Sequence, residues 1–272
     1  MPRNVPTLSL LALIALSVAA CRTTAPAIRT AAFPDAQARL AQQNVDAVIY
    51  QNASAEVYRL YQQGYELARI RLDANLARPH TLPPAVIVDI DETVLDNSPS
   101  NAEDAAQGRT WSPAHWKQWT ALAQAKALPG AVDFLNYAAS RGCTVYYISN
   151  RDADEEAATI KNLAAEGFPM ADAAHVMPME GTSDKTARRT AVAKDHYIAL
   201  LVGDQLTDFD QSFHDRSVGY GKPHVDALRD TLERYFIMLP NPMYGTWLNA
   251  VGGRGDSLKL INKARFLEEH GY

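Results

Sequence analysis

Short runs of apolar, mostly β-branched residues alternate with longer stretches of helical character through most of the chain. The clearest run, residues 85–88, is too short and too uniform for an amphipathic helix and predicts a buried strand. Further strands are predicted at 144–148, 175–177, 198–202 and 235–239. Helices are predicted at 129–141, 152–166, from 183 onward, and at 223–234. Strands that alternate with helices predict an α/β fold with a doubly wound parallel sheet.

Residues 35–78 precede the first predicted strand and are rich in helix-forming side chains. Val57, Leu60, Tyr61 and Tyr65 recur there at helical spacing, which predicts one or two N-terminal helices packed on the main domain. We expect the aromatic side chains of this stretch to belong to the core.

Residues 97–128 follow the first predicted strand and carry no strand pattern. Ser112 and Pro113 are typical of a helix start, with serine at the N-cap and proline at the first helical position. An insertion directly after this strand would lie over the carboxyl ends of the strands, so we expect a small helical cap.

The beginning of the chain differs in character from the rest. Arg3 precedes an uncharged apolar stretch, which predicts a secretory signal peptide at 1–20. Val-Ala-Ala-Cys at 18–21 resembles a bacterial lipobox, in which Cys21 becomes the lipidated first residue of the mature protein. An ordinary signal peptide with an incidental cysteine is the alternative. We expect a lipidated tether at 21–34 and one domain at 35–272.

These features predict an exported protein attached to a membrane through an N-terminal lipid. Arg22, rather than aspartate, follows the cysteine, and by analogy with Gram-negative lipoproteins this favours the outer membrane, facing either the periplasm or the surface. Cys143 lies at the start of an apolar run and is expected to be buried. With Cys21 lipidated, no intramolecular disulfide would form.

Length and charge narrow the class of protein further. The 272 residues suffice for one large domain. A formal net charge of −5 provides no basic surface for a nucleic-acid polymer. A homodimer is left open.

Polar, chemically competent side chains follow several of the predicted strands. Asp89 and Asp91 end the first strand, Ser149 and Asn150 the second, and Asp204 and Asp208 a later one, as follows from their positions in the sequence. Ligands in open α/β sheets bind beyond the carboxyl ends of the strands, so these residues are expected to converge. Lys185, on the helix predicted from 183, is a fourth candidate for the same cleft.

Several neighbouring carboxylates repel one another unless a hard cation with oxygen ligands, such as Mg²⁺, compensates for their charge. Ser149 and Lys185 are suited to bind a phosphoryl group during its transfer. An aspartate can attack phosphorus, and a second carboxyl two residues on can carry the proton. The sequence therefore predicts a phosphoryl-transfer site.

The motifs also resemble a known group of enzymes. Asp-Ile-Asp-Glu-Thr at 89–93, Ser-Asn-Arg at 149–151, Lys185 and Gly-Asp-Gln-Leu-Thr-Asp at 203–208 resemble, in order, the four motifs of the haloacid dehalogenase (HAD) superfamily. Residues 88–97, 129–132 and 239–247 resemble more narrowly the class C acid phosphatases, which include the lipoprotein e group of outer-membrane 5′-nucleotidases. The likeness covers most of the chain beyond residue 40 and implies a HAD-like Rossmann-type core.

The resemblance implies a role for each acidic residue. Asp89 would be the nucleophile and a ligand of one Mg²⁺ per active site. Asp91 would be the general acid and base and would ligate the metal through its backbone carbonyl. Asp204 would complete the protein ligands, and Asp208 would orient either metal-bound water or Lys185.

The resemblance also implies how a phosphomonoester substrate would bind. Ser149 and Lys185 would hold the phosphoryl oxygens, with Asn150 or Arg151 nearby. In the lipoprotein e group an aromatic pair encloses the nucleobase. Tyr244 matches one partner, and Trp116 is the best match for the other, although Trp111 and Trp119 lie close to it in the sequence.

Some of the same residues are compatible with other functions. An EF-hand is rejected, because the loop from Asp89 has Val94 where glycine is needed and Ser100 where glutamate is needed. A surface lipoprotein that binds haem or acts as an adhesin, and a HAD phosphatase for a sugar phosphate, remain the alternatives to an acid phosphatase or 5′-nucleotidase.

Overall fold

The structure is a computed structural model that describes Met1, Phe33 and residues 35–272. The predicted signal peptide, Cys21 and most of the predicted tether lie outside the described residues. Within the described part, none of the helices combines the length and the apolarity needed to cross a membrane.

The domain is built on a five-stranded sheet in which every neighbouring pair is parallel. Its strands are β1 (Pro84–Val88), β4 (Thr144–Asp152), β5 (Val176–Met179), β6 (Tyr197–Gly203) and β7 (Phe236–Met238), in the order β5-β4-β1-β6-β7. The chain runs outward from β1 to β5 and then returns to β6 on the other side of β1. The ends of β4, β1 and β6 therefore lie next to one another at the topological switch point.

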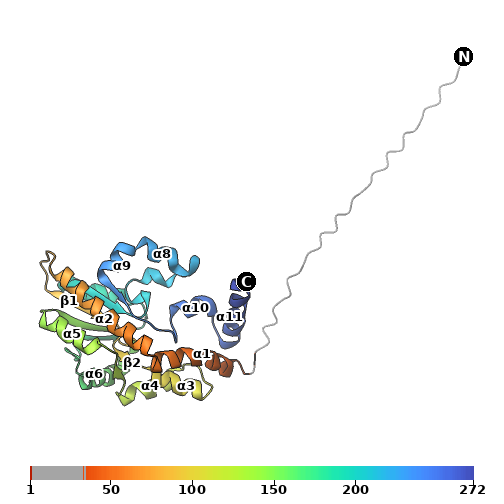
Figure 1. Cartoon of the computed structure of the whole chain (residues 1–272), viewed down its shortest axis with the longest axis horizontal. Helices are drawn as coiled ribbons and strands as arrows, with labels where there is room; N and C mark the ends of the chain where they lie inside the picture. Colours follow the sequence, from red (N-terminus) through yellow and green to blue (C-terminus); the bar gives the residue numbers. More distant parts are fainter. Residues whose placement is uncertain (2–32, 34) are drawn as a thin grey trace. The chain divides into compact units, whose positions relative to one another are not determined.

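Helices surround this sheet (Figure 1). They are α1 (Ala36–Ala53), α2 (Ala55–Leu76), α3 (Ser98–Ala106), α4 (Pro113–Leu122), α5 (Ala131–Ser140), α6 (Glu156–Ala165), α7 (Thr186–Asp195), α8 (Lys222–Ala227), α9 (Arg229–Tyr235), α10 (Thr246–Gly252) and α11 (Asp256–His270). The predicted α/β fold with a doubly wound parallel sheet is confirmed.

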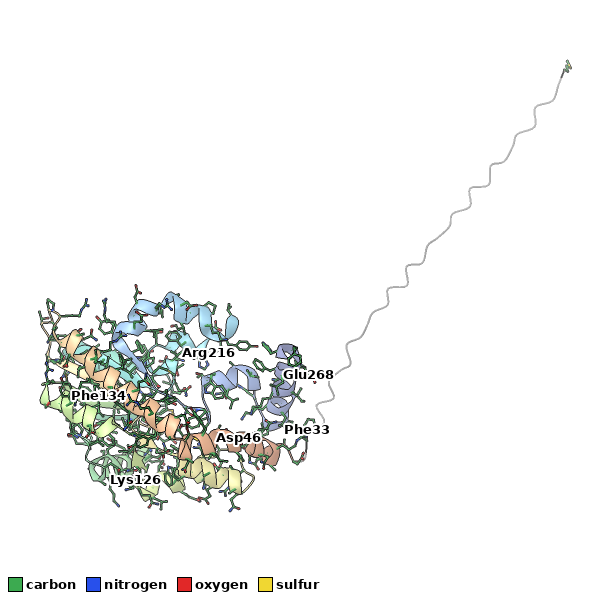
Figure 2. All side chains as sticks on the ribbon, viewed as in Figure 1. Phe33, Asp46, Lys126, Phe134, Arg216 and Glu268 are labelled. Atoms are coloured by element: carbon green, nitrogen blue, oxygen red, sulfur yellow. The ribbon has the colours of Figure 1, made fainter. Side chains whose placement is uncertain are left out.

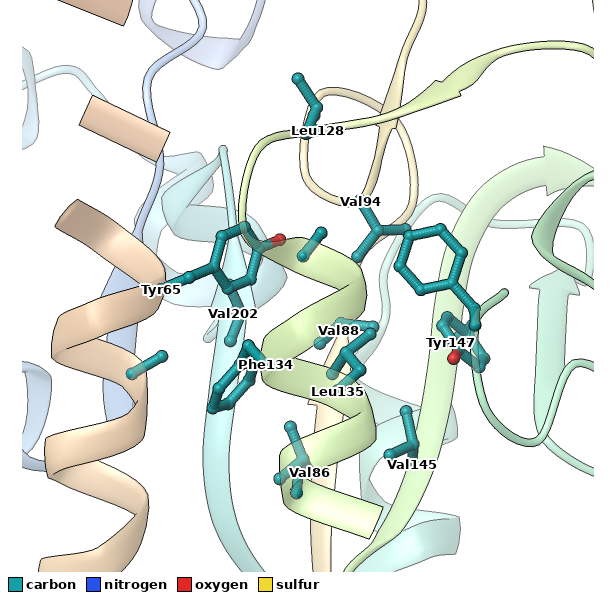
Figure 3. Close-up of a cluster of buried hydrophobic side chains, with 14 of the residues drawn as sticks. Tyr65, Val86, Val88, Val94, Leu128, Phe134, Leu135, Val145, Tyr147 and Val202 are labelled. Carbon is teal, nitrogen blue, oxygen red and sulfur yellow. The ribbon is translucent and has the colours of Figure 1, made fainter. Parts of the chain in front are cut away.

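Alternate side chains of β1 face opposite layers of the domain, as expected for a strand that is buried on both faces. Val86 and Val88 belong to the large apolar cluster with residues of α2 and α5 (Figure 3). Within it, Phe134 of α5, which is labelled among all side chains in Figure 2, packs against Tyr65 of α2 (Figure 3), and their ring centroids are 5.6 Å apart. Ala85 and Ile87 pack on the other face with Val192 of α7.

Two tyrosines of α2 reach from the core to the loop that follows β1. The Tyr61 hydroxyl lies 2.9 Å from the Glu92 carbonyl oxygen and 2.7 Å from that of Pro240. The Tyr65 hydroxyl donates to the Thr93 carbonyl oxygen at 2.6 Å. Both side chains are buried, as predicted. Leu60, which shares the helical spacing, instead points outward and is 42% exposed.

Several element boundaries differ from the sequence prediction. Strand β4 continues to Asp152, because after a register shift Asp152 pairs with Met179 of β5. The next helix consequently begins at Glu156, after a 3₁₀ turn at Ala153–Glu155. The helix expected at 223–234 is interrupted at Leu228 and forms α8 and α9.

The insertion after β1 holds the helices α3 and α4, as expected of a small helical cap. It also contains two short strands that the sequence did not predict, β2 (Leu95–Asp96) and β3 (Lys126–Ala127), which pair in antiparallel fashion. Helix α4 is tied to the segment after β4, since the Thr120 hydroxyl donates to Glu155 at 2.7 Å and the Lys117 ammonium lies 2.7 Å from Asp154.

Tyr61→Phe tests the support that α2 gives to the loop after β1. Removal of the hydroxyl leaves buried carbonyl oxygens without their donor, so we expect the free energy of unfolding to fall by about 1–3 kcal/mol. Urea denaturation measures the change. Tyr58→Phe is the matched control, because Tyr58 lies on the same helix and is 56% exposed; equal losses in both variants would contradict this account.

Candidate active site

Three carboxylates converge where β1 and β6 end. Asp89 follows β1, Asp204 follows β6, and Asp208 lies in the 3₁₀ turn Leu206–Asp208. One oxygen from each lies within 4.8 Å of the others, and all three residues are buried. The predicted convergence of these strand ends is thus present in the structure.

Lys185 lies directly before α7 and inserts its ammonium group into this cluster. It donates to Asp89 and, at 2.7 Å, to Asp208 Oδ1, and it is 3% exposed. Burial alone would lower the pKa of Lys185, but the carboxylates of Asp208 and Asp89 outweigh this effect and the pKa is raised. Lys185 is therefore a charged ammonium at the centre of the site.

The electrostatics of the cluster favour an additional cation. Burial raises the pKa of Asp89 well above its usual range, and the charge of Lys185 opposes this shift. Burial and the neighbouring Asp208 raise the pKa of Asp204 to about 7. These raised pKa values mean that ionisation of the neighbouring carboxylates is costly even beside Lys185, and a divalent cation would favour their ionised forms. Because the available donors are all oxygens, the site suits a hard cation.

Asp204 is held in place by two amide side chains that sequence analysis did not identify. Gln205 Nε2 donates to Asp204 Oδ2 at 2.9 Å, and Asn241 Nδ2 donates to the same oxygen at 2.7 Å. Asn241 Oδ1 also accepts the backbone N–H of Met243 and of Tyr244. The loop after β7 is thereby tied to a carboxylate of the cluster.

The Asp91 carboxylate lies outside that cluster and contacts a different cation. Arg151 Nη2 donates to Asp91 Oδ1 at 2.7 Å, and Arg151 Nε donates to the same oxygen at 3.0 Å. Asn97 Nδ2 donates to Asp91 at 2.9 Å, and the Ser149 hydroxyl lies 3.4 Å from its other oxygen. Arg151 is 2% exposed, and burial alone would lower its pKa. The charge of Asp91 outweighs this effect, so the pKa of Arg151 is raised.

Glu92 holds the backbone of Asn97 in position. Its Oε1 accepts the Asn97 N–H at 2.9 Å, and the side chain is fully buried. Burial, together with the nearby Asp91, raises the pKa of Glu92 well above its usual range. The acidic run after β1 therefore contains three carboxyl groups in three different surroundings.

Ser149 and Asn150 lie within β4 rather than after its end. Ser149 is buried and its hydroxyl accepts the Arg151 N–H at 3.1 Å, whereas the side chain of Asn150 is exposed and accepts from Arg188 Nη2 at 2.9 Å. Arg188 also donates to the carbonyl oxygens of Ser149 and Pro178. The sequence prediction missed Arg188, whose place on α7 gives no signal that its side chain is buried.

The residues considered for the aromatic pair, Tyr244 and the three tryptophans of the cap, differ in their contacts. The Trp116 ring lies 5.6 Å from the Arg151 guanidinium carbon, so Arg151 touches both Trp116 and Asp91. Trp119 instead donates to Asn97 Oδ1 at 2.8 Å, and Trp111 is 62% exposed. Tyr244 is half-buried, and its carbonyl oxygen accepts from Gln205 Nε2 at 3.4 Å. Among the three tryptophans of the cap, Trp116 is thus the one in contact with Arg151 beside Asp91.

A parallel sheet with buried carboxylates and a lysine at its switch point defines an α/β protein of the HAD superfamily class, and comparison with known proteins specifies it further. Residues 7–247 match the family described as HAD superfamily, subfamily IIIB (acid phosphatase). The chain therefore belongs to this acid phosphatase family, and the resemblance to class C acid phosphatases is confirmed.

Solved structures agree with this assignment. The class C acid phosphatase from Bacillus anthracis is 38% identical, with a TM-score of 0.79 and coverage of 84% of this chain and 97% of that chain. The same enzyme with tungstate bound matches at 36% identity and a TM-score of 0.76, with the same coverage. The Stem 31 kDa glycoprotein of Glycine max is 28% identical over 128 residues, which are 45% of this chain and 50% of that protein. The chain thus spans half the length of this curated relative.

A divalent cation should stabilise the folded protein more at about pH 8 than at about pH 5. With its pKa raised to about 7 in the folded state, Asp204 contributes stability at low pH that is lost as the pH rises through that value. A bound cation offsets this loss by binding the ionised carboxylates. Melting temperatures with Mg²⁺ and with EDTA at both pH values measure the effect.

The matched variant for this measurement is Asp204→Asn, which removes the titrating group. We expect it to reduce the cation-dependent shift at the higher pH. A shift of equal size at both pH values in the wild-type protein would contradict a cation site formed by these carboxylates.

Proposed function

We propose that the protein is a Mg²⁺-dependent phosphomonoesterase that hydrolyses nucleoside monophosphates and other phosphomonoesters. The observation that supports this proposal best is the buried cluster of Asp89, Asp204, Asp208 and Lys185 at the ends of β1 and β6. Membership of the acid phosphatase family supports the same class of reaction. The substrate, the metal and the reaction steps below are parts of the proposal.

Asp89 would attack the phosphorus of the substrate. Its carboxylate oxygen forms the new bond to phosphorus while the bond to the leaving oxygen breaks, which gives an aspartyl phosphate. Lys185, which donates to Asp89, would neutralise charge on the transferred group, and the buried Ser149 hydroxyl offers a further donor. Asp208, hydrogen-bonded to Lys185, would hold that ammonium in position.

Asp91 would carry the proton in both steps. It would protonate the leaving alkoxide in the first step, and in the second it would take a proton from the water that hydrolyses the aspartyl phosphate. Phosphate is then released and Asp89 is regenerated. Arg151, Asn97 and Ser149 surround the Asp91 carboxylate and would set the direction from which it reaches the leaving oxygen.

The Asp89 and Asp204 carboxylates would hold the metal, together with the Asp91 backbone carbonyl. The bound cation would supply positive charge for the transferred phosphoryl oxygens. The oxygen-only donors and the excess negative charge of the cluster support this assignment.

The Bacillus anthracis relative also supports an oxyanion substrate. That enzyme has been solved with tungstate, a tetrahedral oxyanion similar in shape to phosphate. For the remainder of the substrate, we propose that Trp116 and Tyr244 stack on the nucleobase. The contact of Arg151 with both Trp116 and Asp91 supports the choice of Trp116 as one member of this pair.

Asp89→Asn should abolish phosphate release from phosphomonoesters, because an amide cannot form the aspartyl phosphate.

Asp91→Asn should keep a low activity, with the rate of phosphate release reduced by a factor of about 10²–10⁴ through loss of general acid–base catalysis. Phosphate release from a panel of phosphomonoesters, with Mg²⁺ and with EDTA, measures both. Turnover like that of the wild type by Asp89→Asn would refute the mechanism, and activity that resists EDTA would refute the metal.

Tyr244→Ala should impair hydrolysis of nucleoside monophosphates more than that of p-nitrophenyl phosphate. Stacking of one base on an aromatic side chain contributes about 1–3 kcal/mol, so kcat/KM for the nucleotide should fall by roughly 5- to 150-fold. Tyr58→Ala is a matched control, because Tyr58 is a tyrosine on α2 that is 56% exposed. An equal loss of kcat/KM on both substrates would contradict stacking of Tyr244 on the nucleobase.

The location of the enzyme is also a proposal. We propose that the chain is exported and attached to the bacterial outer membrane through lipid on Cys21. The supporting features are Arg3, the uncharged apolar stretch at 8–20 and the small residues before Cys21. A surface lipoprotein that binds haem or acts as an adhesin would have no use for the buried Lys185 with its two carboxylate partners, which favours the enzyme.

A further inference from the structure

Asn97 lies between the cap and the Asp91 carboxylate. It directly follows β2, and its side chain is fully buried. Asn97 Nδ2 donates to Asp91 Oδ1 at 2.9 Å, and Asn97 Oδ1 accepts the indole N–H of Trp119 at 2.8 Å. Trp119 belongs to α4. The side-chain amide of Asn97 therefore connects a helix of the cap to Asp91.

The orientation of this amide follows from the chemistry of its neighbours. The Trp119 indole and the Arg151 guanidinium can only donate hydrogen bonds, whereas an ionised carboxylate can only accept them. Arg151 Nη2 lies on the Oδ1 side of Asn97, at 3.4 Å. Turning the amide over would place Oδ1 against an Asp91 oxygen and Nδ2 against these two donors. Because the Trp119 contact is much the shorter of the two, Trp119 contributes most to keeping the NH₂ group directed at Asp91.

The two oxygens of the Asp91 carboxylate consequently have unequal surroundings. Oδ1 accepts from Arg151 Nη2 and Nε at 2.7 and 3.0 Å and from Asn97 at 2.9 Å. Oδ2 has longer contacts, at 3.3 Å to Arg151 Nε and at 3.4 Å to the Ser149 hydroxyl. Oδ1 is thus occupied by hydrogen-bond donors, and Oδ2 is the oxygen available to the leaving group of a substrate.

Trp119 is itself held in a defined place. The next residue, Thr120, is buried and donates to Glu155 at 2.7 Å, in the 3₁₀ turn that follows β4. The indole also packs against the main apolar cluster. Helix α4 is therefore anchored to the end of the strand that carries Arg151. Both donors that face Asn97 Oδ1 are positioned by this part of the fold.

We propose that Trp119 is a positioning residue for proton transfer and that it acts on Asp91 through Asn97. This inference rests on the proposed function, in which Asp91 protonates the leaving oxygen. The role differs from that proposed for Trp116, which lies one turn earlier on the same helix and stacks on the nucleobase. In this arrangement α4 carries both a residue that binds the leaving nucleoside and a residue that directs the acid that protonates it.

Loss of the Trp119 N–H should affect esters according to how much their leaving group needs a proton. A p-nitrophenolate ion is weakly basic and leaves without one, whereas the more basic phenolate ion depends more on the general acid. The ratio kcat/KM reports the transition state relative to free enzyme and free substrate. In the proposed mechanism it covers the step in which the ester bond breaks.

Trp119→Phe tests the role, because it keeps an aromatic ring and removes the N–H donor. The substrates are substituted phenyl phosphates, which are similar in shape and differ in the basicity of the leaving group. Loss of all general acid–base catalysis costs about 10²–10⁴, and a misdirected acid loses part of this. We therefore expect kcat/KM to fall roughly 10-fold for phenyl phosphate and less than about 2-fold for p-nitrophenyl phosphate.

Trp111→Phe is the matched control, since it makes the same substitution in the same cap at an indole that is 62% exposed. It should leave kcat/KM unchanged for every ester. An equal loss for all esters in Trp119→Phe would indicate a general disturbance of the fold and would overturn the positioning role. Unchanged values for all esters would overturn it as well.

A double-mutant cycle tests whether Trp119 acts through Asn97. The Asn97 side chain makes no capping hydrogen bond to α3, so Asn97→Ala removes the amide without removing a helix cap. Once the amide is absent, adding Trp119→Phe should cause no further loss of kcat/KM for phenyl phosphate. Independent, additive losses would overturn the connection through Asn97. Melting curves by circular dichroism establish that the variants compared are folded.

Nuclear magnetic resonance tests the contact without measuring activity. The Trp119 indole N–H should exchange slowly with solvent in the wild-type protein and faster in Asn97→Ala, because its acceptor is removed. The exposed Trp111 indole should exchange rapidly in both proteins. Rapid exchange of the Trp119 indole in the wild-type protein would overturn the proposed contact.

Failure of this inference can be distinguished from failure of the proposed function. Absence of phosphate release from all these esters by the wild-type protein would refute the proposed function and this inference with it. If instead the wild type is active and Asp91→Asn increases the dependence of kcat/KM on the leaving group while Trp119→Phe does not, the positioning role of Trp119 alone is refuted.

Discussion

The rest of the site depends on the pairing of the buried Lys185 ammonium with two carboxylates, those of Asp89 and Asp208. Asp204 completes the same cluster. One ammonium cannot balance three carboxylates away from water, and uncompensated buried charge is costly. The fold brings these residues together from β1, β6 and the start of α7, and the negative charge that remains is a reason for a cation to bind.

Asp89 and Asp91 illustrate how one short loop gives two carboxylates different properties. They are separated by a single residue, yet Asp89 contacts Lys185 and Asp91 contacts Arg151. The two cations come from different parts of the sheet, Lys185 from the segment before α7 and Arg151 from β4. In the proposed mechanism, distinct partners rather than distance along the chain would allow one carboxylate to act as a nucleophile and the other as an acid.

The strands, their parallel arrangement and the convergence of Asp89, Asp204 and Lys185 could be predicted, because hydrophobic periodicity and the rules of parallel sheets act locally and generally. The residues that hold the site in place could not. Arg188 and Asn241 are polar residues whose side chains bind partners 39 and 37 positions away in the sequence. The outward direction of Leu60 could not be predicted either, since helical spacing alone does not say which of two apolar faces meets the core.

The contacts of Tyr61 and Tyr65 have a consequence for how the sequence of the family can vary. Both hydroxyls lie within hydrogen-bond distance of backbone carbonyl oxygens, those of Glu92, Pro240 and Thr93, and the Tyr61 hydroxyl also accepts a hydrogen bond from Gln51. Every amino acid presents the same carbonyl group. Substitutions in these loops can therefore alter the side chains that meet the substrate while the bonds from α2 are retained, so the helix supplies a support on which new specificities can arise without a new scaffold.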